Sequence, residues 1–275
     1  MGDAPGQFRL TVEGLSLRWS SRLGAGRPLV LINGLGGNLE MWDPLRAALV
    51  GRRTLAFDAP GTGESATPGT PMSIDHLARL VAKALDQLGI DDIDVLGYSF
   101  GGAVAQAVAR LDHDRINRLV LVGSTSGWGG LSLDPRAVAE LATPARFYRG
   151  RNADHIDRRA FGDLGGRSFG HLDRARMARP PSLVGYYWQL MAIVGWSSYA
   201  WLNQIQQETL VLVGARDRAA PVRNSEVLAA RIPRASLQVV PEAGHLLLMA
   251  DDVGDPASRI AAFLDAEPTR ARRSA

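Results

Sequence analysis

Short, mostly apolar runs recur along the chain, separated by longer segments in which apolar and polar positions alternate with helical spacing. The runs lie at residues 29–32, 54–57, 93–96, 119–122, 209–213 and 236–240. A strand that is covered on both faces is apolar throughout, as in a parallel sheet. Strands that alternate with helices are typical of β-α-β units. The pattern therefore predicts an α/β fold with a mostly parallel central sheet flanked by helices.

The helical spacing is clearest between the second and third apolar runs. Apolar residues recur there every three or four positions, at Ile74, Leu77, Val81, Leu85 and Leu88. Ser73 is a favoured N-cap residue, and Gly89 is a common stop signal after the last helical turn. The segment predicts a helix over residues 74–88.

Residues 125–206 interrupt the alternation of strands and helices. No convincing strand occurs there, yet the segment holds four of the six tryptophans. A structureless loop of this length is uncommon inside a compact domain. We therefore expect a core built from residues 1–124 and 207–275, with residues 125–206 inserted as a helical cap.

The aromatic residues of the expected cap allow two interpretations. They either form the cap's own small core or line a cleft against the sheet. Tyr187, Trp188, Trp196 and Trp201 carry more apolar area than a minor subdomain is expected to bury alone. We therefore predict these four as substrate-pocket residues.

Composition narrows the range of functions. With no cysteine, the chain has no disulfide, no thiolate nucleophile and no Cys-based metal site. Its N-terminal residues show neither the basic start nor the apolar run of a secretory signal, and no apolar run is long enough for a membrane-spanning helix. We therefore expect a cytoplasmic protein. Arginines are scattered among nearly as many acids, so we expect no nucleic-acid partner.

A candidate nucleophile follows the third apolar run. Residues 97–101 read Gly-Tyr-Ser-Phe-Gly and lead into an apolar helical segment. This is the G-x-S-x-G pattern in its strand–turn–helix context. The glycines permit a strained turn, and the helix N-terminus favours negative charge beside the serine. A Gly/Ser-rich structural turn is the alternative, but the context predicts Ser99 as a nucleophile.

A serine nucleophile needs a base, and the chain has five histidines. His76 lies on the predicted helix, His113 in a polar loop, and His155 and His171 in the expected cap. His245 follows the last predicted strand, at the end of the sheet where ligands gather. It also comes last in the chain, as the order Ser…Asp…His requires. We therefore predict His245 as the base, in preference to an ordinary surface-loop histidine.

The acid that orients the imidazole is expected after a strand between the serine and the histidine. Asp217 follows the fifth apolar run, whereas the run before it ends without a carboxylate. Asp251 and Asp252 come after His245 and are better explained as loop or helix-end charges. Asp217 is therefore the predicted third member of a catalytic triad.

Nucleophilic attack by this triad on a carbonyl group also needs N–H donors for the oxyanion. The backbone N–H of Phe100, directly after the nucleophile, is one expected donor. The other is the backbone N–H of Leu35, in the glycine-rich turn after the first apolar run, where Asn33 and Gly34 are predicted pocket residues. A phosphate cradle is the alternative for this turn, but the chain has neither G-K-[ST] nor G-x-G-x-x-G.

These motifs together resemble the α/β-hydrolase superfamily over roughly residues 27–265. The resemblance rests on the Asn33-Gly34 turn, the D-x-P-G-x-G-x-S turn at residues 58–65, the turn at Ser99, and Asp217 and His245. By itself, the turn at residues 58–65 reads as a structural connection. The resemblance implies the α/β-hydrolase fold with an inserted helical cap.

The chain resembles bacterial intracellular poly(3-hydroxyalkanoate) depolymerases more closely, particularly those for medium-chain-length polyesters. The segments that carry this resemblance are residues 32–40 (INGLGGNLE), 142–148 (ATPARFY), 185–190 (GYYWQL), 195–198 (GWSS), 201–202 (WL) and 205–207 (IQQ). Such depolymerases tend to place Trp after the nucleophile, where this chain has Phe100. That departure leaves the preference for a polymer open.

The resemblance implies a serine hydrolase that cleaves carboxylic esters through an acyl-enzyme and releases 3-hydroxyalkanoic acids or oligomers. It implies no metal or organic cofactor, a hydrophobic ester or polyester as substrate, and association with polyester granules. A small-ester carboxylesterase and a carbon–carbon bond hydrolase with the same triad remain alternatives. A ligand-binding receptor or a biosynthetic enzyme on the same scaffold is a further one. The sequence leaves the oligomeric state open.

Overall fold

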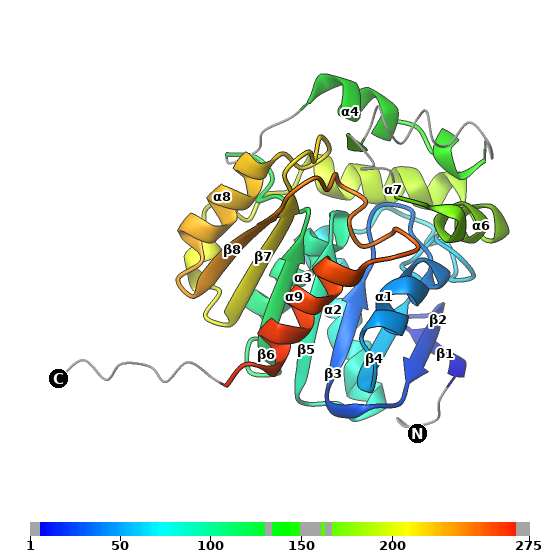
Figure 1. The fold of residues 1–275 in the computed structure, drawn as a ribbon. Coiled ribbons are helices and arrows are strands. Elements are labelled where there is room, and N and C mark those ends of the chain that lie inside the picture. Colours follow the sequence, from blue (N-terminus) through cyan, green and yellow to red (C-terminus); the bar gives the residue numbers. More distant parts are fainter. Residues whose placement is uncertain (1–5, 130–133, 149–160, 163–166, 268–275) are drawn as a thin grey trace.

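A twisted sheet of eight strands forms the centre of the molecule (Figure 1). The computed structural model describes residues 6–129, 134–148, 161–162 and 167–267. The strand order is β1-β2-β4-β3-β5-β6-β7-β8. The hairpin of β1 (Gly6–Val12) and β2 (Leu15–Arg22) is antiparallel, as is the pairing of β2 with β4 (Arg52–Phe57). From β4 to β8, all neighbouring strands run parallel.

Each apolar run of the sequence lies within a strand of the parallel part of the sheet. Besides β4, these strands are β3 (Ala25–Ile32), β5 (Ile93–Tyr98), β6 (Ile116–Val122), β7 (Glu208–Gly214) and β8 (Ala235–Val240). The predicted α/β architecture is therefore confirmed. The pattern of apolar runs did not reveal β1 because this strand lies at the edge of the sheet and exposes alternate side chains.

Helices cover both faces of the sheet (Figure 1). One face carries α2 (Ile74–Leu88), α3 (Phe100–Leu111) and α8 (Val222–Arg231), and the other carries α1 (Asp43–Ala48) and α9 (Gly254–Asp265). The predicted helix 74–88 is confirmed with its ends. The Ser73 side chain accepts a hydrogen bond from the N–H of His76, and Gly89 ends the helix at φ +64°. No helix in these described ranges has the length and apolar character that crossing a membrane demands.

The chain between β6 and β7, which we call the β6–β7 connection (residues 123–207), lies across one end of the sheet (Figure 1). Its described elements are α4 (Pro135–Leu141), η2 (Ala145–Phe147), α6 (Gly170–Ala178), α7 (Leu183–Val194) and η4 (Leu202–Gln204). Where this connection is described, its β-type pairing is one isolated bridge between Gly127 and Ser197. The division into a core and a cap with boundaries near residues 125 and 206 stays a prediction.

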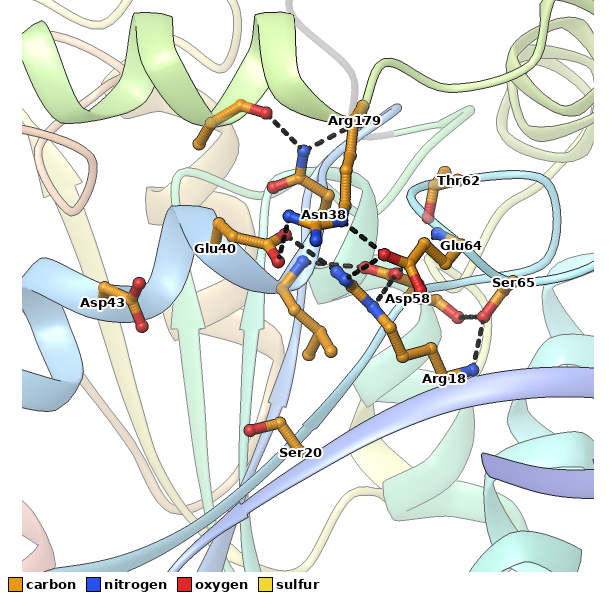
Figure 2. A network of polar contacts seen from close by, with 12 residues as sticks. Arg18, Ser20, Asn38, Glu40, Asp43, Asp58, Thr62, Glu64, Ser65 and Arg179 are labelled. Atoms are coloured by element: carbon orange, nitrogen blue, oxygen red, sulfur yellow. Dashed lines mark hydrogen bonds and ion pairs between the residues drawn. The ribbon is translucent and has the colours of Figure 1, made fainter. Parts of the chain in front are cut away.

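A network of ion pairs lies beneath the turn after β3 (Figure 2). Arg18 on β2 is buried, and its Nε donates to Asp58 at 2.7 Å. Its other nitrogens donate to Glu40 at 2.8 Å and Glu64 at 3.2 Å. Arg179, which follows α6, donates to the same two glutamates at 2.9 and 2.6 Å. The network therefore ties β2 and two turns of the core to the β6–β7 connection.

Burial dominates the electrostatics of Asp58. It raises the pKa of the Asp58 carboxyl, although the N–H of Glu64 and the Arg18 guanidinium act in the opposite direction. Removal of Arg18 would leave this carboxylate buried with only hydrogen bonds from the N–H groups of Leu39 and Glu64. These buried contacts of Asp58 agree with the interpretation of the turn at residues 58–65 as a structural connection.

Arg18→Met is expected to lower the free energy of unfolding by about 3–5 kcal/mol, because it breaks a buried pair and leaves one charge uncompensated. Urea denaturation measures the change. Arg22→Met is the matched control on the same strand, since Arg22 pairs with Asp43 at 2.9 Å where both side chains are 43% exposed. We expect the control to lose less than about 1 kcal/mol. Equal losses in the two variants would contradict a structural role for the buried pair.

Candidate active site

Ser99 sits at a strained bend between β5 and α3. Its backbone has φ +54° and ψ −118°, in a region that residues with side chains rarely occupy. The glycines on either side make the bend possible. A Cβ atom at Gly101 would lie 2.1 Å from the carbonyl oxygen of Ile32, and one at Gly97 would lie 2.4 Å from that of Gly101. The sequence thus holds the Ser99 hydroxyl above the end of the sheet.

The structure brings together three side chains from loops that follow β5, β7 and β8. His245 Nε2 lies 2.9 Å from Ser99 Oγ, and His245 Nδ1 lies 2.7 Å from Asp217 Oδ2. The other oxygen of Asp217 accepts a hydrogen bond from the N–H of Ala220 at 2.8 Å. With its proton on Nδ1, the imidazole donates to Asp217 and presents Nε2 as an acceptor to the Ser99 hydroxyl.

Aromatic residues hold the imidazole of His245 in place. The ring of Phe161 stacks on it, with centroids 5.2 Å apart and planes 19° apart. The Tyr98 hydroxyl donates to the carbonyl of His245 at 3.1 Å, and the N–H of His245 donates to the carbonyl of Phe161 at 3.1 Å. Sequence reasoning missed both aromatic residues. Tyr98 stood beside Ser99 in the motif, but nothing in the sequence pointed to Phe161.

The other described histidines lie in different surroundings. His76 pairs with Glu13, His113 is an exposed neighbour of Asp114, and the His171 ring contacts the carbonyl of Glu40. His155 lies outside the described residues. Where the chain is described, no group of three or more His, Cys, Asp or Glu side chains is arranged to hold a metal ion.

A pocket of about 360 Å³ opens beside Ser99. The predicted residues Asn33, Gly34, Leu35 and Phe100 line it, together with Ser99 and His245. Much of the remaining lining is apolar and comes from the short helix η1 (Leu39–Trp42), the β6–β7 connection and the loop after β8: Met41, Phe147, Leu172, Leu190, Ile193, Val194, Leu246 and Met249. Arg146 and Arg176 are its charged members, and both are buried.

The four aromatic residues predicted for the pocket are not among its lining, as far as the described chain shows. Trp196 is buried in the core cluster beneath α2 and α3, and Trp201 packs edge-on against it. Trp188 donates its indole N–H to the carbonyl of Pro68, and Tyr187 is 43% exposed. This is a correction to the sequence prediction, and helix geometry explains half of it. Positions 186, 189, 190 and 193 share the face of α7 toward the core, so Trp188 points elsewhere. Tyr187 lies on the exposed side of α7, the same side as Val194.

Comparisons with known proteins agree with this architecture. Residues 27–252 match the family model described as the alpha/beta hydrolase fold. Over 225 residues the chain is 39% identical to a poly(3-hydroxyalkanoate) depolymerase of Ectopseudomonas oleovorans. This alignment covers 81% of this chain and 79% of the relative.

Solved structures resemble most of the chain. A hydrolase from Pseudomonas aeruginosa PA01 is 27% identical with a TM-score of 0.76, covering 96% of this chain and 100% of that one. An enol-lactonase from Burkholderia xenovorans LB400 is 25% identical with a TM-score of 0.77, covering 94% of this chain and 100% of that one. The family model spans most of the sheet and includes Ser99, Asp217 and His245, which are joined by hydrogen bonds. This protein is a hydrolase and belongs to the α/β-hydrolase fold family.

Proposed function

We propose that the protein is a serine hydrolase of carboxylic esters and that its substrate is a hydrophobic polyester of 3-hydroxyalkanoic acids. The observation that carries the proposal is the hydrogen-bonded chain from Ser99 Oγ through His245 to Asp217, beside an apolar pocket. The similarity to a relative named as a poly(3-hydroxyalkanoate) depolymerase supports the choice of substrate.

In the proposed reaction, Ser99 Oγ attacks the ester carbonyl carbon while its proton passes to His245 Nε2. Asp217 stabilises the imidazolium that forms. The tetrahedral intermediate then collapses, His245 protonates the leaving alcohol oxygen, and an acyl-enzyme remains. Water repeats the sequence with His245 as base, which releases the carboxylic acid and restores the Ser99 hydroxyl.

The turn after β3 supports Leu35 as a source of one oxyanion donor. The N–H of Gly34 donates to Asn33 Oδ1, that of Gly36 to Gln189 Oε1, and that of Gly37 to the carbonyl of Gly34. Leu35 lies between these engaged amides and lines the pocket near Ser99. The N–H of Phe100, at the start of α3, is the proposed second donor.

Exposed apolar residues around the opening of the pocket support a hydrophobic substrate that extends beyond the pocket. Trp128, Val138 and Val194 line the pocket and are also exposed, by 58%, 44% and 57% of their surfaces. On α7, the exposed apolar residues Leu183, Val184, Tyr187 and Met191 extend this surface outward. An apolar rim around the opening suits a water-insoluble polyester, such as a granule, better than a small polar ester.

A panel of substrates tests this function. Purified protein is offered p-nitrophenyl esters of graded acyl length beside a suspension of medium-chain-length poly(3-hydroxyalkanoate). We expect release of 3-hydroxyalkanoic acids from the polymer and loss of all turnover in Ser99→Ala. Activity on short esters without polymer turnover would reject the polyester and favour a small-ester carboxylesterase, the alternative that Phe100 after the nucleophile keeps open.

Labelling with a fluorophosphonate separates an enzyme from a ligand-binding receptor on the same scaffold. The reagent forms a covalent bond with an activated serine, so wild type should be labelled and Ser99→Ala should not. Intact protein that remains unlabelled would reject the serine-hydrolase mechanism.

A further inference from the structure

The turn that carries the proposed Leu35 donor is held by side chains of the β6–β7 connection. We propose that Gln189 and Arg146 are positioning residues for the Leu35 N–H. The position of the β6–β7 connection on the core then sets the rate of acyl transfer. This inference rests on the proposed ester hydrolysis at Ser99 and adds its control by residues remote from the triad.

Gln189 joins α7 to two turns of the core. Its side chain is buried, its Oε1 accepts from the N–H of Gly36 at 3.0 Å, and its Nε2 donates to the carbonyl of Pro60 at 3.4 Å. A buried N–H is strongly disfavoured without an acceptor, so this contact constrains the turn. A displacement of α7 therefore acts directly on Gly36.

Arg146 in η2 binds the neighbouring carbonyl. Its Nη2 donates to the carbonyl of Leu35 at 3.0 Å, and its Nη1 donates to the Tyr186 hydroxyl at 2.8 Å. The Tyr186 hydroxyl donates in turn to the carbonyl of Leu141 at 2.7 Å. The guanidinium also lies over the Phe147 ring, 4.6 Å from its centroid. These contacts anchor Arg146 within the connection while it reaches the turn.

The two contacts act on a single peptide group. The carbonyl of Leu35 and the N–H of Gly36 belong to the same planar unit, so a hydrogen bond at each polar end fixes its orientation. The Leu35 N–H lies in the preceding peptide group. Its direction relative to the held group depends only on the two backbone dihedral angles of Leu35. The direction of the Leu35 N–H, the proposed oxyanion donor, therefore depends on the position of the β6–β7 connection.

Packing at Gly36 closes the turn against the connection. Gly36 has φ +73°, and a Cβ atom there would lie 2.7 Å from the Phe147 ring and 3.0 Å from the Tyr186 ring. At the far end of the turn, Asn38 Nδ2 donates to the carbonyls of Ala175 and Arg179, each at 2.8 Å (Figure 2). The turn is therefore in contact with η2, α6 and α7 together.

Steady-state kinetics of Gln189→Met on p-nitrophenyl acetate tests the inference. Methionine has a similar length but offers no comparable acceptor to the N–H of Gly36. Because misplacement by about 1 Å can cost about 100-fold, we expect kcat to fall by roughly 10- to 100-fold. KM should change little, since the acetyl group needs few pocket contacts. Phosphonylation of Ser99 by a fluorophosphonate should slow in parallel, because its phosphoryl oxygen needs the same donors.

Two further variants complete the experiment. Thr67→Val is the matched control, because Thr67 Oγ1 lies 2.8 Å from the hydroxyl of Ser182, the N-cap of α7. This control removes a hydrogen bond between α7 and the core without touching the oxyanion turn, and it should keep the kcat of wild type. Arg146→Met removes the contact with Leu35 and should lower kcat as Gln189→Met does. Circular dichroism establishes that each variant is folded.

The outcomes separate the inference from the proposed function. Wild-type kcat in folded Gln189→Met and Arg146→Met overturns the inference, as does a fall that Thr67→Val shares. A change confined to KM also overturns it, since that marks a role in substrate binding. Wild-type protein that neither hydrolyses the ester nor reacts with the fluorophosphonate overturns the proposed function itself.

Discussion

His245→Ala is expected to lower kcat for ester hydrolysis by on the order of 10⁶-fold, the loss typical when the base of such a triad is removed. The cause is direct. His245 Nε2 is the atom 2.9 Å from Ser99 Oγ, so its loss leaves the hydroxyl without a base and the leaving alcohol without an acid. Kinetics on a p-nitrophenyl ester, with active-site titration to count competent molecules, measures the effect.

A histidine elsewhere on the chain provides the control for this variant. His76 pairs with Glu13 on the surface and is not part of the pocket lining, so His76→Ala should turn over substrate like wild type. Thermal melting must show that His245→Ala remains folded. A folded His245→Ala with turnover within about tenfold of wild type would reject the assigned base, because losses of general acid–base catalysis are typically 10²-fold or more.

Asp217→Asn is expected to lower kcat by about 10⁴-fold while the backbone stays in place. The carboxylate lies 2.7 Å from His245 Nδ1 and accepts a hydrogen bond from the Nδ1–H of the imidazole. An amide there can donate to Nδ1 instead, which moves the imidazole proton to Nε2. The atom that must accept the Ser99 proton is then already protonated. The same kinetic assay, extended over pH, reports the loss.

Asp252→Asn is the matched control for this substitution. Asp252 follows His245 in sequence, and its carboxylate accepts from the N–H of Gly254 at 2.8 Å in an exposed loop. An asparagine oxygen can accept the same bond, so activity should not change. If the two variants lose activity equally, Asp217 does not orient the imidazole.

Local sequence patterns predicted many of the strands, one helix with its ends, and the residues that meet at the site. Six mostly apolar runs marked the strands β3 to β8. The runs in β3 to β7 are apolar because helices cover both faces of the sheet there, whereas β8 at the edge is only partly buried. Ser73 and Gly89 marked the ends of α2 because capping depends on single residues at helix ends. Ser99, Asp217 and His245 were found by position after strands, since parallel strands bring their C-terminal ends to one edge of the sheet.

Local patterns failed where the environment of a residue depends on distant segments. Their composition suggested that Tyr187, Trp188, Trp196 and Trp201 line the pocket. Whether each is buried depends instead on its face of α7 or on its packing in the core. The edge strand β1 also escaped the argument, because one exposed face removes the continuous apolar run.

The sequence by itself determined the six strands of the parallel part of the sheet, the helix α2, the strained bend at Ser99 and the residues able to form a triad. Each of these depends on residue type and short spacing. Tertiary structure alone decided which side chains of the β6–β7 connection line the pocket, and that Gln189 and Arg146 hydrogen-bond to the Leu35–Gly36 peptide group. Those contacts join positions more than 100 residues apart, and no local rule of periodicity or capping relates such positions before the chain has folded.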